Sequence, residues 1–256
     1  MQGRLPFFLC LFICTSLFSH SIPMLYQKNH LEATSHVEKL MVDHARTSVE
    51  NALKMRSKLC DRIFNESEAS KQWRHSVLPH YHALNDITQI EYYHLLNNLC
   101  NLKNATHLHV GLLAGDSYIA SLYGNQWELK EQIGVDWFME CPETIFKENC
   151  GLFLDSHKYH ILHSGCFEVD KSTFTSPINI YFYDADHSLM GHEKALTYYN
   201  DIFADIFIVV IDDWNCPWIR IATFKAFSEL NYHTLYETFV HSIKINSDQY
   251  IAVIRK

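Results

Sequence analysis

Short apolar runs alternate with longer amphipathic stretches from residue 107 to the C-terminus. The clearest run, residues 206–211, is a continuous series of Ile, Phe and Val, which is typical of a strand buried on both faces. The alternation predicts an α/β fold, in which a doubly wound, mainly parallel sheet has helices on both faces. We expect strands over residues 107–111, 131–136, 159–163, 179–183 and 206–211, a closing and potentially antiparallel strand over 249–254, and helices starting at 117 and covering 190–203 and 217–230.

The residues before this region have a different pattern. Apolar positions at helical spacing predict one helix within residues 31–59 and a second that ends near residues 97–98. We therefore divide the chain into an α-helical extension, residues 22–100, and an α/β domain, residues 101–256.

The first 21 residues form a separate segment. Arg4 precedes an apolar run of 14 residues, 5–18, and the small residues of Ser19-His20-Ser21 follow it. The run is short for a membrane span, which needs about 20 residues. A cleaved signal peptide is the leading interpretation, with an uncleaved anchor and a buried helix as alternatives. Six cysteines would remain after cleavage, and either up to three disulfides or free buried thiols are compatible with that number.

Composition and charge narrow the range of partners. The chain is 48% apolar with a net charge of -8, and its Lys and Arg residues do not cluster. We expect an ordinary globular protein with no nucleic-acid partner, whose membrane contact is confined to the N-terminal segment. The sequence does not indicate an oligomeric state.

Candidate ligand-binding residues follow the first two strands. Gly111 and Gly115 lie between a predicted strand and a helix, where glycines permit a tight turn and close approach of a ligand. Asp136 follows the second strand, 25 residues after Gly111. An acidic residue at about this distance is suited to a ribose. Together they favour a nucleoside-containing cofactor; the alternatives are an ordinary turn and an exposed aspartate.

A cluster of carboxylates follows the next two strands. Asp184, Asp186 and His187 come after one strand, and Asp212-Asp213 after the other. The carboxyl ends of parallel strands open on the same face, so these groups should converge, and their mutual repulsion is usually relieved by a cation. Oxygen ligands favour Mg²⁺ or Ca²⁺. The alternative is that Asp186 and Asp213 cap helices.

These motifs resemble those of class I S-adenosylmethionine-dependent methyltransferases, in particular bacterial small-molecule O-methyltransferases. The likeness covers residues 108–124, 133–138, 178–199 and 206–225, and is most specific in Tyr181-Phe182-Tyr183-Asp184-Ala185-Asp186-His187-Ser188 and in Asp212-Asp213. The resemblance implies that S-adenosylmethionine is the cofactor. Its methionine part would lie against Gly111, Gly115 and Ser117, near His109, and its ribose against Asp136.

The resemblance also implies a catalytic centre. Asp184, Asp212 and Asp213 match the ligands of a divalent cation such as Mg²⁺ in the metal-dependent members. Such an ion would bind and activate the hydroxyl of a small hydroxylated molecule or sugar. Asp184 and His187 would be catalytic, with His187 acting as a base or orienting another group. The N-terminal helices resemble a lid, and Trp137, Phe138, Trp214 and Trp218 are candidates for lining the acceptor pocket.

Two positions depart from the family pattern. His109 replaces the usual acidic residue of the first motif, and Asp116 occupies a small-residue position beside the cofactor. These departures, together with the signal-like N-terminus, leave a second interpretation open: an exported binding protein without catalytic activity. The N-terminus favours export or anchoring, whereas the cofactor favours the cytoplasm. A third interpretation is a metal-dependent hydrolase that uses the aspartates.

Overall fold

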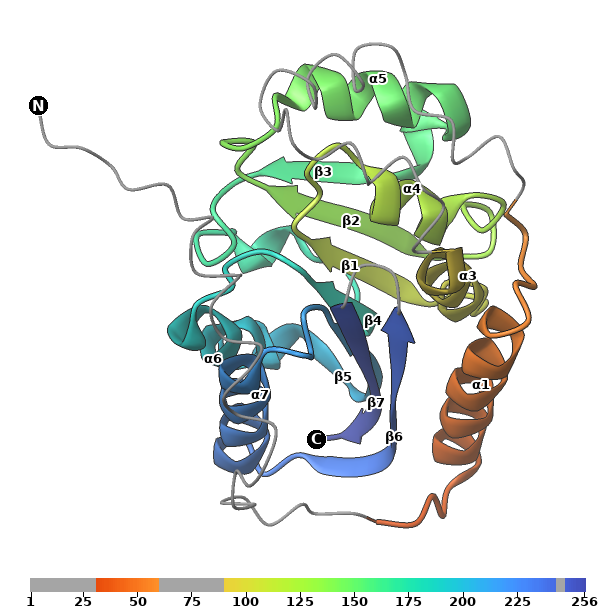
Figure 1. Ribbon diagram of the computed structural model, residues 1–256, viewed down its shortest axis with the longest axis vertical. Coiled ribbons are helices and arrows are strands. Elements are labelled where there is room, and N and C mark those ends of the chain that lie inside the picture. Colours follow the sequence, from red (N-terminus) through yellow and green to blue (C-terminus); the bar gives the residue numbers. More distant parts are fainter. Residues whose placement is uncertain (1–30, 60–89, 243–246) are drawn as a thin grey trace, which may run out of the picture.

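Seven strands form one mixed sheet at the centre of the molecule (Figure 1). The computed structural model describes residues 31–59, 90–242 and 247–256. The strand order is β3-β2-β1-β4-β5-β7-β6; β1 to β5 are parallel, and β7 pairs antiparallel with both β5 and β6. The strands are β1 (Thr106–Val110), β2 (Glu131–Asp136), β3 (His160–His163), β4 (Ile178–Tyr183), β5 (Phe203–Ile211), β6 (His233–Ser242) and β7 (Ser247–Arg255).

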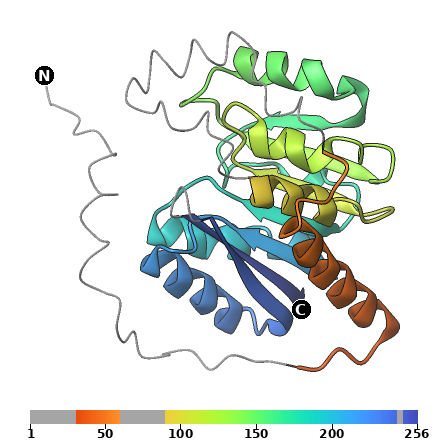
Figure 2. The ribbon, with the colours of Figure 1, turned by 45° about the vertical axis from the view of Figure 1, so that its right-hand side comes forward.

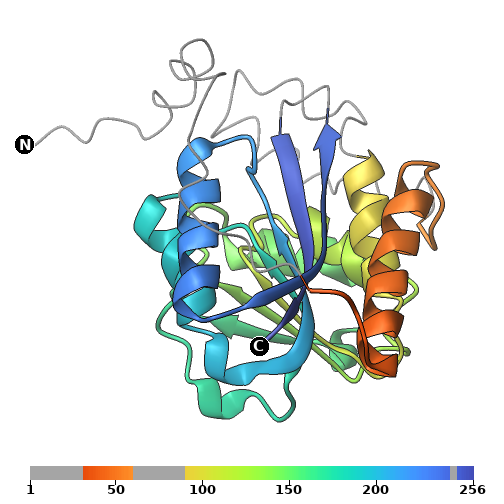
Figure 3. The same cartoon turned by 90° about the horizontal axis from the view of Figure 1, so that it is seen from below.

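Helices cover both faces of the sheet. One layer comprises α1 (His36–Ala52), α3 (Ile90–Leu99), α4 (Asp116–Leu122) and α5 (Glu143–Phe153), and the other comprises α6 (Leu189–Thr197) and α7 (Pro217–Glu229). Viewed along the sheet, α1 and α3 lie on one side and α6 and α7 on the other (Figures 2 and 3). The prediction of a doubly wound α/β fold is therefore confirmed.

The alternation of side chains along β4 explains why both faces are covered. Phe182 packs with α1 and α3, whereas Tyr181 and Tyr183 face the layer of α6 and α7. Tyr181 is fully buried, and its hydroxyl donates to the carbonyl of Ala195 in α6 (2.7 Å). Because successive side chains of a strand point to opposite faces, a strand apolar at every position requires helices on both sides.

The helices before residue 100 pack directly against the sheet. Residues of α1 such as Met41 and Ala45 and of α3 such as Leu95 form a core with Ile208 of β5 and other residues of the sheet. Both helices agree with the sequence prediction, and they form part of the layer that covers the sheet. Their action as a lid stays a prediction.

Parts of the secondary-structure prediction differ from the structure. The predicted helix over 190–203 ends at Thr197, and Phe203 begins β5 after a short 3₁₀ turn. Helix α5 and strand β6 were not predicted.

Among the described residues, no disulfide joins Cys100, Cys141, Cys150, Cys166 and Cys216. The predicted signal segment lies outside the described residues, and none of the described helices is long and apolar enough to cross a membrane.

Glu38 links the start of α1 to the end of β7. Its Oε2 accepts hydrogen bonds from the backbone of Thr34 and Ser35 (both 2.8 Å), and its Oε1 accepts from Arg255 Nη1 (2.8 Å). The Ser35 hydroxyl reciprocates by accepting from the Glu38 amide, which completes a capping box. Only 3% of Glu38 is exposed. This carboxylate therefore holds the first helix at the edge of the fold.

We expect Glu38→Gln to lower the Tm by several degrees at neutral pH, because the amide cannot replace a carboxylate that accepts from two amides and a guanidinium. The hydrogen bonds from Ser35 and Thr34, with the help of Arg255, lower the pKa of Glu38 to about 2. This stabilisation is complete above the ordinary pKa of about 4.3 and is lost as the pH falls towards 2. The difference in Tm between wild type and variant should shrink over that interval. Asp43→Asn, at an exposed ion pair with Arg46, is the control and should leave the Tm nearly unchanged.

Candidate functional site

The strand order reverses between β1 and β4, and the residues singled out from the sequence lie at the carboxyl ends of these and the adjacent strands. Ligands of doubly wound sheets bind at such a position. Gly111 follows the first strand directly and has a φ of 92°, and a Cβ on it would lie 1.7 Å from the carbonyl oxygen of Asp184. The turn after β1 thus runs against the turn after β4, which brings the cofactor residues and the carboxylates into one site.

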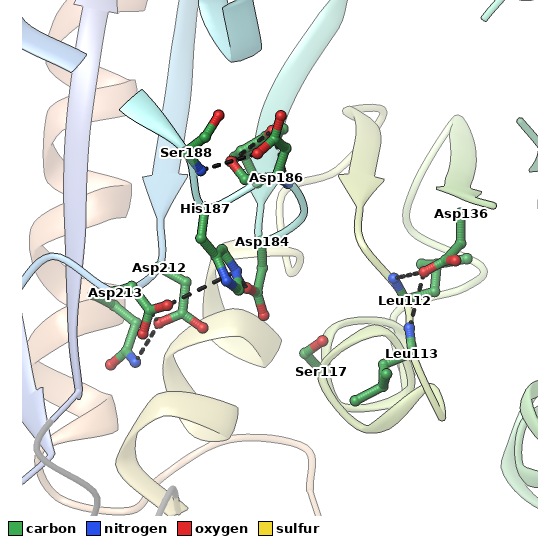
Figure 4. Close-up of polar contacts among 12 residues, drawn as sticks. Leu112, Leu113, Ser117, Asp136, Asp184, Asp186, His187, Ser188, Asp212 and Asp213 are labelled. Carbon is green, nitrogen blue, oxygen red and sulfur yellow. Dashed lines mark hydrogen bonds and ion pairs between the residues drawn. The ribbon is translucent and has the colours of Figure 1, made fainter. Parts of the chain in front are cut away.

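Asp136 holds the turn after β1 from the neighbouring strand (Figure 4). Its Oδ2 accepts hydrogen bonds from the backbone of Leu112 (2.7 Å) and Leu113 (3.1 Å), and its Oδ1 accepts from Phe138 (2.5 Å). A carboxylate oxygen has two lone pairs, so Oδ2 is fully used and Oδ1 keeps one. In this arrangement, Asp136 can bind one ribose hydroxyl while it still holds the turn.

His109 and Ser117 meet beneath the turn. His109 Nε2 and Ser117 Oγ are 3.0 Å apart and share a hydrogen bond, and the imidazole packs against Phe182 with ring centroids 4.2 Å apart. His109 is fully buried, and this burial places its pKa well below the usual value. The family's acidic position therefore carries a neutral ring here, which supplies no negative charge for the ammonium group of a methionine.

The second half of the site is a cluster of Asp184, His187, Asp212 and Asp213, which we call the acidic cluster (Figure 4). His187 Nε2 donates to Asp184 Oδ1 (2.9 Å) and lies 3.8 Å from Asp213 Oδ2. Asp212 Oδ1 accepts from the backbone of Asp213 (2.8 Å) and from Gln249 Nε2 (3.0 Å). The structure thus brings these four predicted residues together, with the imidazole between two of the carboxylates.

Charge within the acidic cluster determines its protonation. Burial lowers the pKa of His187, but its hydrogen bond to Asp184 and the charges of Asp184, Asp213 and Asp212 raise it to about 9. Burial and the charges of Asp184 and Asp213 raise the pKa of Asp212 well above its usual range. Although burial opposes it, the contact with His187 lowers the pKa of Asp184. At neutral pH the imidazole of His187 is therefore protonated.

The helix-capping alternative does not describe these aspartates. Ser188 is the N-cap of α6 and its hydroxyl accepts from Gly191, while Cys216 precedes α7. Asp186 supports the turn before α6 by accepting from the amide of Ser188 (2.9 Å). Asp213 has a φ of 52°, a conformation that aspartate tolerates better than most residues. Both aspartates therefore shape the loops of the site and do not cap its helices.

The predicted metal site is not supported. In the part of the chain that the structure describes, no group of three or more His, Cys, Asp or Glu side chains is arranged to hold a metal ion. The donor set explains this result, because His187 occupies the space between Asp184 and Asp213 and Asp212 is hydrogen bonded through Oδ1. In this arrangement the residues do not fit a divalent cation.

Two residues of the site were missed from the sequence. Gln249 is fully buried in β7 and donates to Asp212; a polar residue at the start of an apolar strand was the available signal. Tyr92 of α3 is 3% exposed, and among the residues that the structure describes its hydroxyl has no hydrogen-bond partner. Burial and the charges of Asp212, Asp184 and Asp213 raise its pKa well above the usual value, which places this hydroxyl near the acidic cluster. The helical layer thus contributes a polar group to the site.

The candidate aromatic residues of the acceptor pocket have different environments. Trp214 is 6% exposed and stacks on Tyr250 with centroids 4.0 Å apart, so it belongs to the core. Trp218 Nε1 donates to the carbonyl of His187 (3.0 Å) and supports the loop of the acidic cluster. Trp137 is 58% exposed beside Asp136, and it is the one of these three that offers an accessible apolar surface at the site.

Comparison with known proteins identifies the fold. The sequence matches no family model and no curated protein. An O-methyltransferase from Bacillus cereus, solved in complex with SAH, aligns over 84% of this chain and 100% of its own at 13% identity and a TM-score of 0.55. A candidate O-methyltransferase from Nostoc punctiforme aligns over 83% of this chain and 68% of its own, at 16% identity and a TM-score of 0.50. A candidate SAM-dependent methyltransferase from Streptococcus mutans aligns over 66% of this chain and 49% of its own, at 12% identity and a TM-score of 0.51.

These structures share little sequence with the chain but agree with it in architecture. The sheet, the glycine turn after β1 and the acidic residues after β2, β4 and β5 occupy the places that the sequence resemblance assigned to them. The chain therefore has the fold of the S-adenosylmethionine-dependent methyltransferases.

Proposed function

We propose that this protein is an S-adenosylmethionine-dependent methyltransferase that methylates an oxygen of a small hydroxylated molecule or sugar. The observation that carries the proposal is the Gly111 turn, which faces Asp136 of β2 on one side and the backbone of Asp184 on the other. The fold it shares with the O-methyltransferase from Bacillus cereus supports the same conclusion.

Each part of the cofactor has a candidate site. The ribose would bind the remaining lone pair of Asp136 Oδ1, and the adenine would lie against the exposed face of Trp137. The methionine part would lie against the backbone of Gly111 and Gly115, whose positive φ angles let the chain turn closely around a ligand. Ser117, tied to His109, would complete this end through its hydroxyl. The neutral His109 predicts weaker binding of the ammonium group than a carboxylate would give.

The reaction transfers the methyl group of a sulfonium to an oxygen nucleophile, and it depends mainly on positioning. S-adenosylmethionine supplies the electrophilic methyl group, and the electron pair of the broken S–C bond remains on sulfur. The Asp184 carboxylate would accept the proton that the acceptor hydroxyl loses, and the positive charge of His187 would hold Asp184 in its ionised form. His187 already carries a proton at neutral pH, so we assign it this supporting role and not that of the base.

A second function is favoured by two observations. The neutral ring of His109 and the engagement of Asp136 by the turn both reduce what the site offers a cofactor. A binding protein that keeps the fold without catalysis would account for them. The absence of a nucleic-acid partner, the hydrolase alternative and the cellular compartment stay as predictions from the sequence.

The proposal is tested by calorimetric titration of the protein with S-adenosylmethionine and S-adenosylhomocysteine. We expect micromolar binding that Asp136→Ala weakens about 30-fold, or about 2 kcal/mol, because a ribose contact and the support of the turn are both lost. Asp170→Ala is the matched control, since Asp170 also accepts from a backbone amide (Ser172, 3.0 Å) but lies in a surface turn outside the site. No binding by folded wild-type protein would overturn the proposal; binding without methyl transfer to any hydroxylated acceptor would favour the second function.

A further inference from the structure

His187 lies where a cation would have to bind. It follows β4 by four residues, and its Nε2 reaches the carboxylates of Asp184 at 2.9 Å and Asp213 at 3.8 Å (Figure 4). These two carboxylates come from the ends of different strands, β4 and β5. The imidazole therefore lies between the two carboxylates, in the place where the sequence led us to expect a metal ion.

Two of the oxygens that a metal ion would use are already engaged. Asp184 Oδ1 accepts from His187, and Asp212 Oδ1 accepts from both Gln249 and the Asp213 amide. A divalent cation would need several oxygens within about 2.0–2.6 Å of one point, and it would have to displace the imidazole to reach them. The imidazole and a cation would therefore compete for the same space.

The loop keeps His187 in this position. Its carbonyl accepts from Trp218 Nε1 (3.0 Å) in α7, and the next residue, Ser188, is the N-cap of α6 and is held by Asp186 (2.9 Å). His192 stacks beside it with centroids 6.4 Å apart.

We propose that the side chain of His187 takes the place of a divalent cation, so that the acidic cluster binds no metal ion until His187 is removed. The inference concerns the chain's own charges and does not depend on the proposed methyl transfer. Its consequence for that reaction is that an acceptor would be held by hydrogen bonds to the cluster and not by chelation to a metal. The site would then differ from that of the metal-dependent enzymes it resembles.

The test is titration of the protein with Mn²⁺ alone, followed by the loss of the electron paramagnetic resonance signal of free Mn²⁺. We expect no saturable binding by wild type up to millimolar Mn²⁺. His187→Ala should gain about one site per chain, at least tenfold tighter than any wild-type binding, because the carboxylates of Asp184 and Asp213 then face the space that the imidazole had filled. Asp184→Asn in the His187→Ala background should abolish the gained site.

A matched control removes a different histidine–carboxylate pair. His163 contacts Glu143 (3.1 Å) outside the acidic cluster, so His163→Ala should bind no more Mn²⁺ than wild type. His187→Ser, which also removes the ring, replaces His187→Ala if the alanine variant does not fold. The inference is overturned if wild type binds Mn²⁺ as tightly as the variant, or if the folded variant of His187 binds none.

Discussion

Gly111→Ala is expected to destabilise the protein by about 4 kcal/mol or more and to prevent cofactor binding in any fraction that folds. The added Cβ would lie 1.7 Å from the carbonyl oxygen of Asp184 and 2.5 Å from its carbonyl carbon. Both are backbone atoms that cannot rotate away, so the turns after β1 and β4 would have to separate. The φ of 92° adds strain for any residue with a side chain. Urea denaturation followed by circular dichroism measures the change.

Gly151→Ala provides the matched control. Gly151 lies in α5, and a Cβ added there meets no atom within 4 Å. Alanine is favoured over glycine in a helix, so this variant should be up to about 1 kcal/mol more stable than wild type. If Gly111→Ala proves as stable as wild type, the close approach of the two turns, and with it the basis of the proposed function, is wrong.

The parallel half of the sheet could be predicted because its strands carry an unambiguous signal. Residues 206–211 are apolar at every position, and the observed strand β5 is buried throughout this run except at its first residue, Ile206. Such a run needs helices on both faces, which implies the doubly wound class. The pairing of β7 between β5 and β6 does not follow from the pattern, because local periodicity carries no information on which strands become neighbours.

The missed elements have weaker patterns. Strand β6 lies at the edge of the sheet that the described residues form, beside β7, and leaves Phe239 60% exposed, so its apolar and polar positions do not separate into two faces. Helix α5 is short and contains Gly151, a poor helix former. The error at residues 198–203 has another cause: Tyr199 and Phe203 are apolar and buried, as a continued helix would require, but they serve a turn and a strand.

The sequence predicts which acidic residues lie close together in the site, but not which hydrogen bonds and ion pairs they form. Asp184 and Asp212 follow adjacent parallel strands, so their convergence follows from the fold class. The position of His187 depends on the turn between β4 and α6, and the contribution of Gln249 depends on the antiparallel return of β7. The chemical conclusion changed for this reason: the same residues that suggested a metal site form an ion pair of their own.

Asn97→Ala is expected to cost about 3–5 kcal/mol, because this buried amide joins three parts of the helical layer. Asn97 Nδ2 donates to the carbonyls of Ala120 (2.7 Å) and Tyr123 (2.9 Å) at the end of α4, and its Oδ1 accepts from the amide of Lys58 (3.0 Å). The carbonyls at the end of a helix have no partner within it. Alanine would therefore leave three backbone groups unpaired, two of them on the helix that follows the Gly111 turn.

The adjacent Asn98 separates this effect from a general intolerance of α3 to alanine. Asn98 also donates to two carbonyls, of Ser48 (3.3 Å) and Arg56 (2.8 Å), but it is partly exposed, so water can replace the lost bonds. Asn98→Ala should cost about 1 kcal/mol or less by urea denaturation. A similar loss for both variants would show that the layer does not depend on Asn97. A selective loss for Asn97→Ala, accompanied by weaker binding of S-adenosylhomocysteine, would show that the N-terminal helices support the cofactor turn through α4.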